Sequence, residues 1–211
     1  VGKTSLAISL ANLLDIPRAV ATDDLRQVMR LTLTRELAPA LHASSYSAWK
    51  SISSTMGEDA VISGFREQAR VVCVGVKAII SRCIEENSSV IIDGVHLISD
   101  LLELETYAGD AFITPVCLGL PDRKAFEERF AQRASEAPAR PMHRYLEHLD
   151  EILKIQDYLI ETSTAPGIPV ITTSTVESLT SKVSMVVSEQ LQEQEEIKKA
   201  LNAARKGRKK Q

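Results

Sequence analysis

The sequence predicts an α/β fold in which a parallel sheet lies between two layers of helices, a three-layer sandwich. Two observations support this prediction. Short apolar runs that end in polar residues alternate with longer stretches of helical periodicity, which is typical of parallel strands joined by helices. The chain also opens with a glycine, a lysine and two hydroxyl residues directly before a helical stretch. Its 211 residues are enough to bury one core and a small helical insert.

The opening segment has the form of the last part of a phosphate-binding loop, the Walker A motif, followed by the helix that it caps. In this motif a glycine lets backbone N–H groups point at phosphate oxygens, a lysine reaches the β- and γ-phosphates, and the next hydroxyl binds Mg²⁺. Gly2, Lys3 and Thr4 stand at these positions, and Ser5 follows them. Only half of the motif is present, and the alternative is an ordinary helix N-terminus with a threonine near its cap.

Composition narrows the class of protein. Hydrophobic residues make up 44% of the chain and charged residues 25%, as in an ordinary globular protein. The net charge of −3 argues against general nucleic-acid binding. The most apolar run, 71–80, is too short to cross a membrane and contains Lys77. The three cysteines lack metal-ligand spacing, so we expect buried thiols in a reducing, cytoplasmic protein. The oligomeric state is left open.

The first predicted strand, 18–22, runs directly into Asp23 and Asp24. Ligands of doubly wound sheets lie just beyond the carboxyl ends of the strands, so these two carboxylates are candidate site acids. An aspartate at the N-cap of the next helix would explain one of them without a site. Arg26 and Arg30 are four residues apart on that helix. They form an anion clamp if their shared face lies toward the cleft, and a solvated face if it lies outward.

The segment 41–50 is rich in hydroxyl side chains and contains the only tryptophan, Trp49. This composition suits a substrate-facing loop better than a helix interior, because serine side chains compete with the helical backbone for hydrogen bonds. Ser45 and Tyr46 lie in this segment and are candidate binding residues. We expect Trp49 itself to pack against a helix.

A core helix is predicted over 59–87, with a break near Gly64 as the alternative, and leads into the strand 89–96. That strand is a continuous apolar run ending in Asp93, as expected of a parallel strand buried on both faces. Asp93 matches the second carboxylate of a nucleotide site, near Mg²⁺ or the acceptor hydroxyl. Gly94 follows it where hydrolysing ATPases commonly have a glutamate, so transfer to a bound acceptor is favoured. A strand followed by an ordinary turn is the alternative.

The region of about 122–160 contains two helical stretches that carry several arginines and are separated by prolines. We predict that it forms a lid that brings Arg129 and Arg133 onto the transferring phosphoryl group and excludes water. The alternative is a solvated helix face on which the arginines pair with neighbouring glutamates.

Further strands are predicted at 111–120 and 167–172, and a long helix from 175 to about 201. The last fourteen residues include seven Lys or Arg and no acid. We expect a solvated basic tail here rather than a nucleic-acid arm, since no aromatic residue is interleaved. The chain therefore divides into a core with its lid, 1–175, and a C-terminal helix with the tail, 176–211.

Several of these segments together resemble the 2-phosphoglycerate kinase family of P-loop kinases. The loop end V-G-K-T-S and the strand at 91–96 are general to P-loop kinases. The specific part consists of T-D-D-x-R-x-V-M-R at 22–30 and S-S-Y-x-A-W at 44–49. The resemblance covers about residues 1–175 and includes the arginine-bearing segment between Arg129 and Leu146.

The resemblance implies a parallel sheet of order 2-3-1-4-5, flanked by helices, whose first strand is missing from the chain. It also implies an ATP- and Mg²⁺-dependent enzyme that transfers the γ-phosphoryl group to the 3-hydroxyl of 2-phosphoglycerate, giving 2,3-bisphosphoglycerate. Such a phosphorylated acid needs several fixed cations, and arginine binds phosphate and carboxylate in two-pronged fashion. The expected catalytic residues are Lys3, Asp23, Asp24, Asp93, Arg129 and Arg133, with the identity of the base left open. ATP is expected at Gly2, Lys3, Thr4, Ser5, Arg129 and Arg133, the acceptor at Asp24, Arg26, Arg30, Ser45 and Tyr46, and Mg²⁺ at Thr4 and Asp93.

Other functions are compatible with the same residues. The architecture also suits a kinase for another acceptor, such as a sugar nucleotide, or a non-catalytic P-loop module that binds a partner through its C-terminal helix and basic tail. A nucleic-acid-dependent ATPase is disfavoured by the absence of a glutamate after Asp93. Because the missing strand would be the central one, we expect the 211 residues alone to bind ATP poorly and to be weakly active or inactive.

Overall fold

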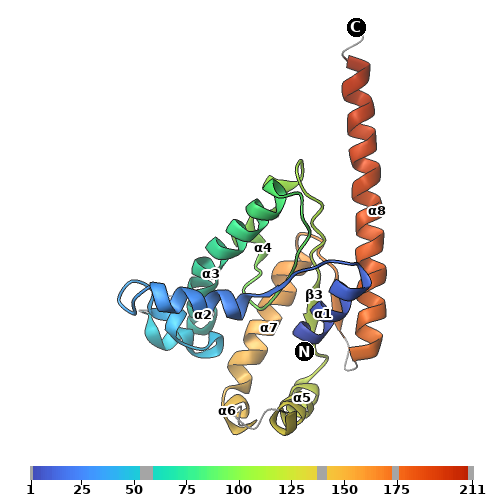
Figure 1. Cartoon of the computed structure of the whole chain (residues 1–211). Helices are drawn as coiled ribbons and strands as arrows, with labels where there is room; N and C mark the ends of the chain where they lie inside the picture. The colour runs from blue at the N-terminus through green and yellow to red at the C-terminus, as the bar shows by residue number, and fades with distance from the viewer. Residues whose placement is uncertain (1, 53–58, 137–141, 173–175, 209–211) are drawn as a thin grey trace.

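The computed structural model describes residues 2–52, 59–136, 142–172 and 176–208 of the chain (Figure 1). The protein has mixed α/β structure and is mostly helical, with two small parallel sheets of two strands each. The predicted alternation of strands and helices is confirmed, while the order of a complete five-stranded sheet stays a prediction. Within the described part of the chain, no helix is both long and apolar enough to span a bilayer.

Both sheets are parallel and short. β1 (Ala19–Ala21) pairs with β2 (Ile91–Asp93), and β3 (Cys117–Gly119) pairs with β4 (Val170–Thr172). All four strands lie inside the segments predicted to be strands. In the expected order 2-3-1-4-5 they correspond to the neighbours 2-3 and 4-5, and no described strand bridges β2 and β3. β2 is half-buried rather than buried on both faces as predicted, because it borders a cavity.

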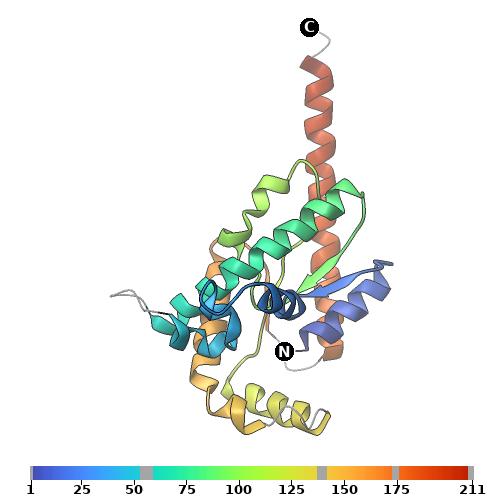
Figure 2. The same ribbon diagram turned by 60° about the vertical axis from the view of Figure 1, so that its left-hand side comes forward.

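α1 (Lys3–Leu13) and α8 (Val176–Arg208) pack against each other and against the strands. α1 ends at Leu13, and its C-cap Leu14 is followed by a residue with positive φ, Asp15. α8 is longer than predicted, and its last turns extend beyond the body of the molecule (Figures 1 and 2). The buried apolar residues of this part of the core are Leu6, Leu10, Ile171, Leu179, Val183 and Val187.

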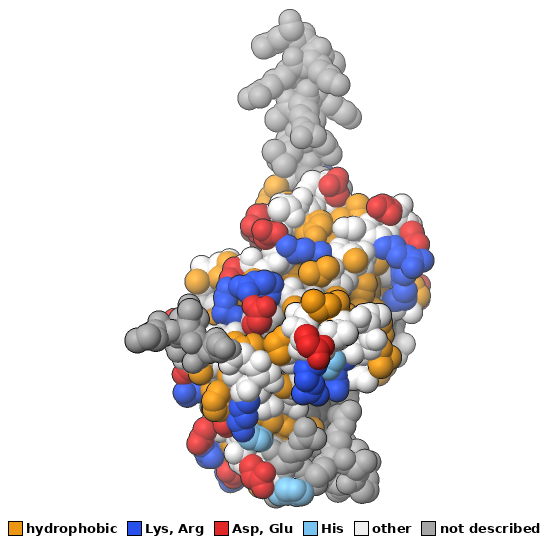
Figure 3. All heavy atoms as spheres, turned by 90° about the vertical axis from the view of Figure 1, so that its left-hand side faces the viewer, with side chains coloured by type: hydrophobic (Ala, Val, Ile, Leu, Met, Phe, Trp, Pro, Cys, Tyr) orange, Lys and Arg blue, Asp and Glu red, His pale blue; other side chains and the backbone are white. Residues whose placement is uncertain are grey.

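α3 (Ala60–Glu85) is the longest helix of the other half and is continuous through Gly64, so the alternative of a break there is wrong. At Gly64 the helix lies directly against the 3₁₀ helix η2 (Ser45–Ser51), where an added Cβ would stand 2.2 Å from the backbone nitrogen of Trp49. Trp49 therefore packs against a helix, as expected. The same half contains α2 (Thr22–Thr32) and the 3₁₀ helix η1 (Pro39–His42). On the side that carries α2, acidic, basic and apolar side chains are interspersed (Figure 3).

The region predicted to be a lid contains α5 (Arg123–Glu136), α6 (Met142–Leu146) and α7 (Leu149–Thr164). α7 packs along α3, with Ile155 and Phe65 in one apolar cluster. α5 and α6 pack against the start of α7, at the end of the molecule opposite the tip of α8 (Figure 2). The proline hinge lies outside the described residues, so the lid stays a prediction. The remaining short helices are α4 (Ser99–Leu102) and η3 (Leu104–Tyr107).

Candidate functional site

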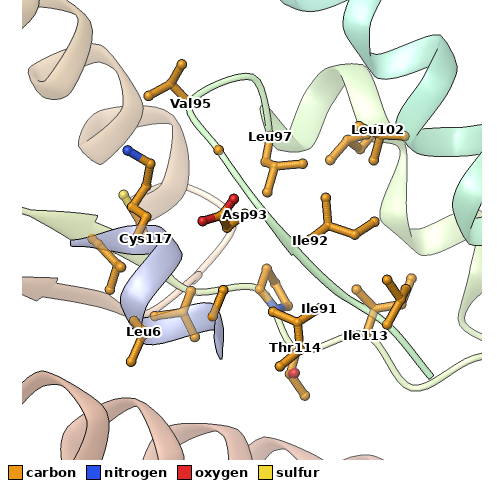
Figure 4. Close-up of a pocket in the computed structure, with 18 of the residues that line it drawn as sticks. Leu6, Ile91, Ile92, Asp93, Val95, Leu97, Leu102, Ile113, Thr114 and Cys117 are labelled. Carbon is orange, nitrogen blue, oxygen red and sulfur yellow. The ribbon is translucent and has the colours of Figure 1, made fainter. Parts of the chain in front are cut away.

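A cavity of about 1330 Å³ lies between the two sheets and is lined from both (Figure 4). β2 contributes Ile91, Ile92 and Asp93, and β3 contributes Cys117. Most of the lining is apolar, and its charged residues other than Asp110 gather at the carboxyl ends of β1 and β2. We call one side of this polar part the α1–β2 wall, formed by Lys3, Asp93 and Gly94, and the other the α2–η2 wall, formed by Asp23, Asp24, Arg26, Ser44, Ser45 and Tyr46.

The α1–β2 wall combines a helix N-terminus with a half-buried carboxylate. Gly2 precedes α1 with a φ of 70°, a left-handed conformation that glycine adopts without strain, and Lys3 is the first residue of the helix. Asp93 ends β2, and its carboxylate points into the cavity (Figure 4). Its Oδ2 is buried with no hydrogen-bond partner among the described residues. Because such an oxygen is costly unless it meets a donor or a cation, this wall is suited to a ligand that brings one.

Gly94 is required by the way the two strand ends meet. Its φ is 154°, and a Cβ added there would lie 1.7 Å from Oγ1 of Thr22, the first residue of α2. The close approach of these two residues brings the start of α2 against the end of β2. The sequence signal for this contact was the Asp-Gly pair that ends the strand.

Thr4 and Ser5 are exposed on the first turn of α1 and are not among the described residues that line the cavity. Within the described ranges, no three His, Cys, Asp or Glu side chains form a cluster that would hold a metal ion. Mg²⁺ needs no such cluster, because it keeps several of its waters and takes few protein oxygens. The hydroxyl of Thr4 and the orphaned oxygen of Asp93 are ligand types that suit it, so the predicted Mg²⁺ site stays a prediction.

The acids of the α2–η2 wall stand in the first turn of α2. The N-cap of that helix is Ala21, without a side-chain cap, so the alternative in which an aspartate is the N-cap is wrong. Asp23 and Asp24 are both exposed and both line the cavity. Acids in the first turn are favoured by the helix dipole, and here they also face the open space of the site.

The two arginines of α2 separate. Arg26 lines the cavity, donates from Nη1 to the Ala43 carbonyl at 2.8 Å, and has its Nε 3.5 Å from Oδ1 of Asp23. Arg30 donates to Oε1 of Gln27 at 3.1 Å and is not among the described lining residues. Of the two arginines in the predicted anion clamp, Arg26 lines the cavity. The role of Arg30 as a substrate ligand stays a prediction.

The hydroxyl-rich segment 41–50, predicted to be a substrate-facing loop, consists mainly of parts of the 3₁₀ helices η1 and η2. Ser45 and Tyr46 of η2 line the cavity. Tyr46 stacks on His148 of the α6–α7 turn, with ring centroids 4.8 Å apart, and meets Tyr145 edge-on. Arg129 donates to Gln132 on α5 and is not among the described lining residues, and the side chain of Arg133 lies outside the described part of the chain. Their predicted role in closure stays a prediction.

His96 is a residue near the site that the sequence analysis did not single out. It is fully buried, and its Nδ1 lies 2.8 Å from Oγ1 of Thr22. Burial lowers the pKa of its imidazole to about 4; the charges of Arg26 and Lys3 add to this lowering, and that of Asp23 opposes it. The imidazole is therefore neutral at pH 7. The available signal was a histidine two residues after the Asp-Gly end of a buried strand.

Comparison with known proteins shows that the relatives of this chain are kinases. Specifically, the chain is homologous to archaeal proteins named 2-phosphoglycerate kinase. It is 35% identical to that of Methanocaldococcus jannaschii over 191 residues, 90% of the chain and 61% of the relative. The identity is 36% with that of Pyrococcus horikoshii (87% of the chain, 59% of the relative) and 34% with that of Methanopyrus kandleri (96% and 62%).

The chain thus spans about three fifths of the length of these relatives. The resemblance to 2-phosphoglycerate kinases that the sequence motifs predicted is confirmed as homology. No protein-family model matches the chain, and neither does any solved structure.

Proposed function

We propose that this chain is the larger part of an ATP-dependent kinase that phosphorylates 2-phosphoglycerate to 2,3-bisphosphoglycerate. One observation supports this most directly. Lys3, Asp23, Asp24, Arg26 and Asp93, separated by up to 90 positions of sequence, line the same cavity. The homology to named 2-phosphoglycerate kinases extends over about 90% of the chain.

In the proposed reaction, an oxygen–phosphorus bond forms between the acceptor hydroxyl and the γ-phosphorus while the bond to the ADP oxygen breaks. Lys3 supplies a fixed positive charge to the β- and γ-phosphates, and the N–H groups at the start of α1 add their partial positive charge. Asp23 or Asp24 accepts the proton of the acceptor hydroxyl. Arg26 binds the phosphate or carboxylate of the acceptor in two-pronged fashion.

Mg²⁺ neutralises charge on the transferring group when it is bound, and Thr4 and Asp93 are its proposed ligands. Arg129 and Arg133 are proposed to approach the nucleotide when α5 and α6 close. Tyr46 lines the site and stacks on His148 of the α6–α7 turn. Through this contact, a movement of α5 and α6 would shift the part of the site that is proposed to bind the acceptor.

The proposal is tested with the full-length protein, including the segment that the relatives have and these 211 residues do not. ATP consumption is measured with and without 2-phosphoglycerate, with 3-phosphoglycerate, glycerate and a sugar nucleotide as comparison acceptors. We expect consumption that depends on 2-phosphoglycerate and yields a doubly phosphorylated glycerate. Preference for a sugar nucleotide, or ATP loss without any acceptor, would contradict the proposal.

A further inference from the structure

We propose that His96 and Gln68 form a positioning pair that holds Ser45 and Arg26 in place for acceptor binding. This inference rests on the proposed function, and it assigns to that site two residues that do not line it. Both are fully buried, and they join four segments far apart in sequence: the start of α2, the η1–η2 segment, α3 and the turn after β2.

The direction of every hydrogen bond in this network follows from its two backbone ends. Nε2 of Gln68 lies 2.7 Å from the Ala40 carbonyl and 2.9 Å from the Ala43 carbonyl. Carbonyl oxygens only accept, so the amide nitrogen must face them and Oε1 must face the other way. Oε1 lies 3.1 Å from Nε2 of His96, which must therefore carry the proton.

The same logic continues through the imidazole. A neutral imidazole with its proton on Nε2 has a bare Nδ1, which accepts a hydrogen bond from the hydroxyl of Thr22 at 2.8 Å. On the other side, the hydroxyl of Ser45 donates to Oε1 of Gln68 at 2.7 Å. Its oxygen also lies 3.5 Å from Nε2 of His96, a longer contact than the 3.1 Å between that nitrogen and Gln68. With its only proton committed to Gln68, Ser45 offers the cavity an acceptor oxygen. That oxygen suits a ligand hydroxyl and not a phosphate oxygen.

Arg26 depends on the same carbonyl as Gln68. Nη1 of Arg26 donates to the Ala43 carbonyl at 2.8 Å, alongside the 2.9 Å bond from Gln68. Loss of the amide at Gln68 therefore frees the η1–η2 turn and the guanidinium that is anchored to it. Lys3 and Asp93 make none of these bonds, so the nucleotide side of the proposed site is spared.

The experiment measures the KM for 2-phosphoglycerate and for ATP in full-length variants. In Gln68→Met, which keeps the volume and loses the amide, we expect the KM for 2-phosphoglycerate to rise about 10-fold, with the KM for ATP nearly unchanged. His96→Met should act similarly. His96→Gln carries an N–H donor that can reach Oε1 of Gln68, so it should recover much of the loss.

Gln194→Met is the matched control. Gln194 also makes two backbone bonds, accepting from Ile113 N at 3.2 Å and donating to Ile113 O at 2.9 Å, but it lies on α8. It should change neither KM. Equal rises in both KM values in Gln68→Met, or an acceptor effect as large in Gln194→Met, would show a merely structural role and overturn the proposal.

A second measurement does not require activity. Nitrogen NMR of the wild-type protein identifies which imidazole nitrogen of His96 carries the proton. The proposal requires a neutral ring protonated on Nε2 at pH 7, and a ring protonated on Nδ1 overturns it. If the enzyme fails to use 2-phosphoglycerate while this tautomer is found, the proposed function fails and the network stands.

Discussion

The two walls of the site differ in how their polar groups are satisfied. In the α2–η2 wall, Nη1 of Arg26 and the hydroxyl of Ser45 are bonded to groups within the chain, and only Nε of Arg26 is buried without a hydrogen-bond partner among the described residues of that wall. In the α1–β2 wall, the Asp93 oxygen is buried without a described partner, and no described strand pairs with the second edge of β2. A wall held by several hydrogen bonds within the chain sets the shape of the site, whereas a wall with an unsatisfied carboxylate oxygen recruits a cation or a hydrogen-bond donor. Substitutions in the two walls should therefore have different effects.

The largest expected effect is in the α1–β2 wall, from Lys3→Ala. Removal of one fixed charge that stabilises a transferring phosphoryl group should lower kcat/KM of the full-length kinase by about 10²–10³-fold. Lys199→Ala is the control, because Lys199 forms an exposed ion pair with Glu195 at 2.8 Å on α8. Steady-state kinetics of both variants decide the matter. A Lys3→Ala enzyme with nearly full turnover would remove Lys3 from the phosphate site.

The next effect is a loss of folding stability at acidic pH that is caused by His96, which lies behind the α2–η2 wall. The ordinary pKa of a histidine is 6.5, and burial lowers that of His96 to about 4. The unfolded chain therefore takes up the proton first as the pH falls. The free energy of unfolding should decrease between about pH 6.5 and 4, by about 3 kcal/mol from this group, with no loss above pH 7.

Carboxylates titrate in the same pH range, so the contribution of His96 is measured as a difference between the wild-type protein and a variant without the histidine. Urea unfolding of wild type and His96→Gln at pH 7 and pH 5 isolates the histidine. The variant should lose less stability between the two pH values than wild type does. Parallel losses would mean that His96 is charged in the folded protein or reaches water.

The sequence predicted lining residues of both walls, but it did not predict the hydrogen-bond network behind the α2–η2 wall. Asp93 and Lys3 follow local signals, an apolar run that ends in an acid and a glycine before a helix, and both line the cavity. The bond between Gln68 and His96 joins positions 28 apart, and no periodicity marks it. A fully buried glutamine on an apolar helix is a signal only when its partners are known. The alternative of an aspartate N-cap for α2 is wrong for a related reason. Thr22 already begins the helix, and its hydroxyl bonds to His96, a residue far away in sequence.

Gly64→Ala tests how closely η2 packs against α3. A Cβ there would overlap the Trp49 backbone, whose nitrogen is 2.2 Å away, so η2 must shift. We expect a loss of about 1–3 kcal/mol in the free energy of unfolding, despite the higher helix propensity of alanine. Gly109→Ala is the control, because nothing lies within 4 Å of its added Cβ. Denaturant unfolding measures both, and equal stabilities would show that the helix and η2 are loosely packed.

The smallest expected effect comes from Asp59, which caps α3 away from both walls. Its Oδ1 accepts from the Val61 N–H at 2.9 Å, and its Oδ2 lies 2.7 Å from Nζ of Lys154 on α7. The Lys154 hydrogen bond is the main cause of its lowered pKa. Asp59→Ala should cost about 1 kcal/mol through the lost cap, whereas Lys154→Ala, which breaks only a half-exposed ion pair, should cost about 0.5 kcal/mol or less.

Neither change at this end of α3 should alter the KM for 2-phosphoglycerate, because neither residue bonds to the network of Gln68. Unfolding experiments and acceptor kinetics on the same two variants separate stability from positioning. If the KM for 2-phosphoglycerate rises in Asp59→Ala as much as in Gln68→Met, the whole of α3 positions Ser45. The α2–η2 wall would then owe its shape to the entire helix behind it and not only to the hydrogen bonds of Gln68.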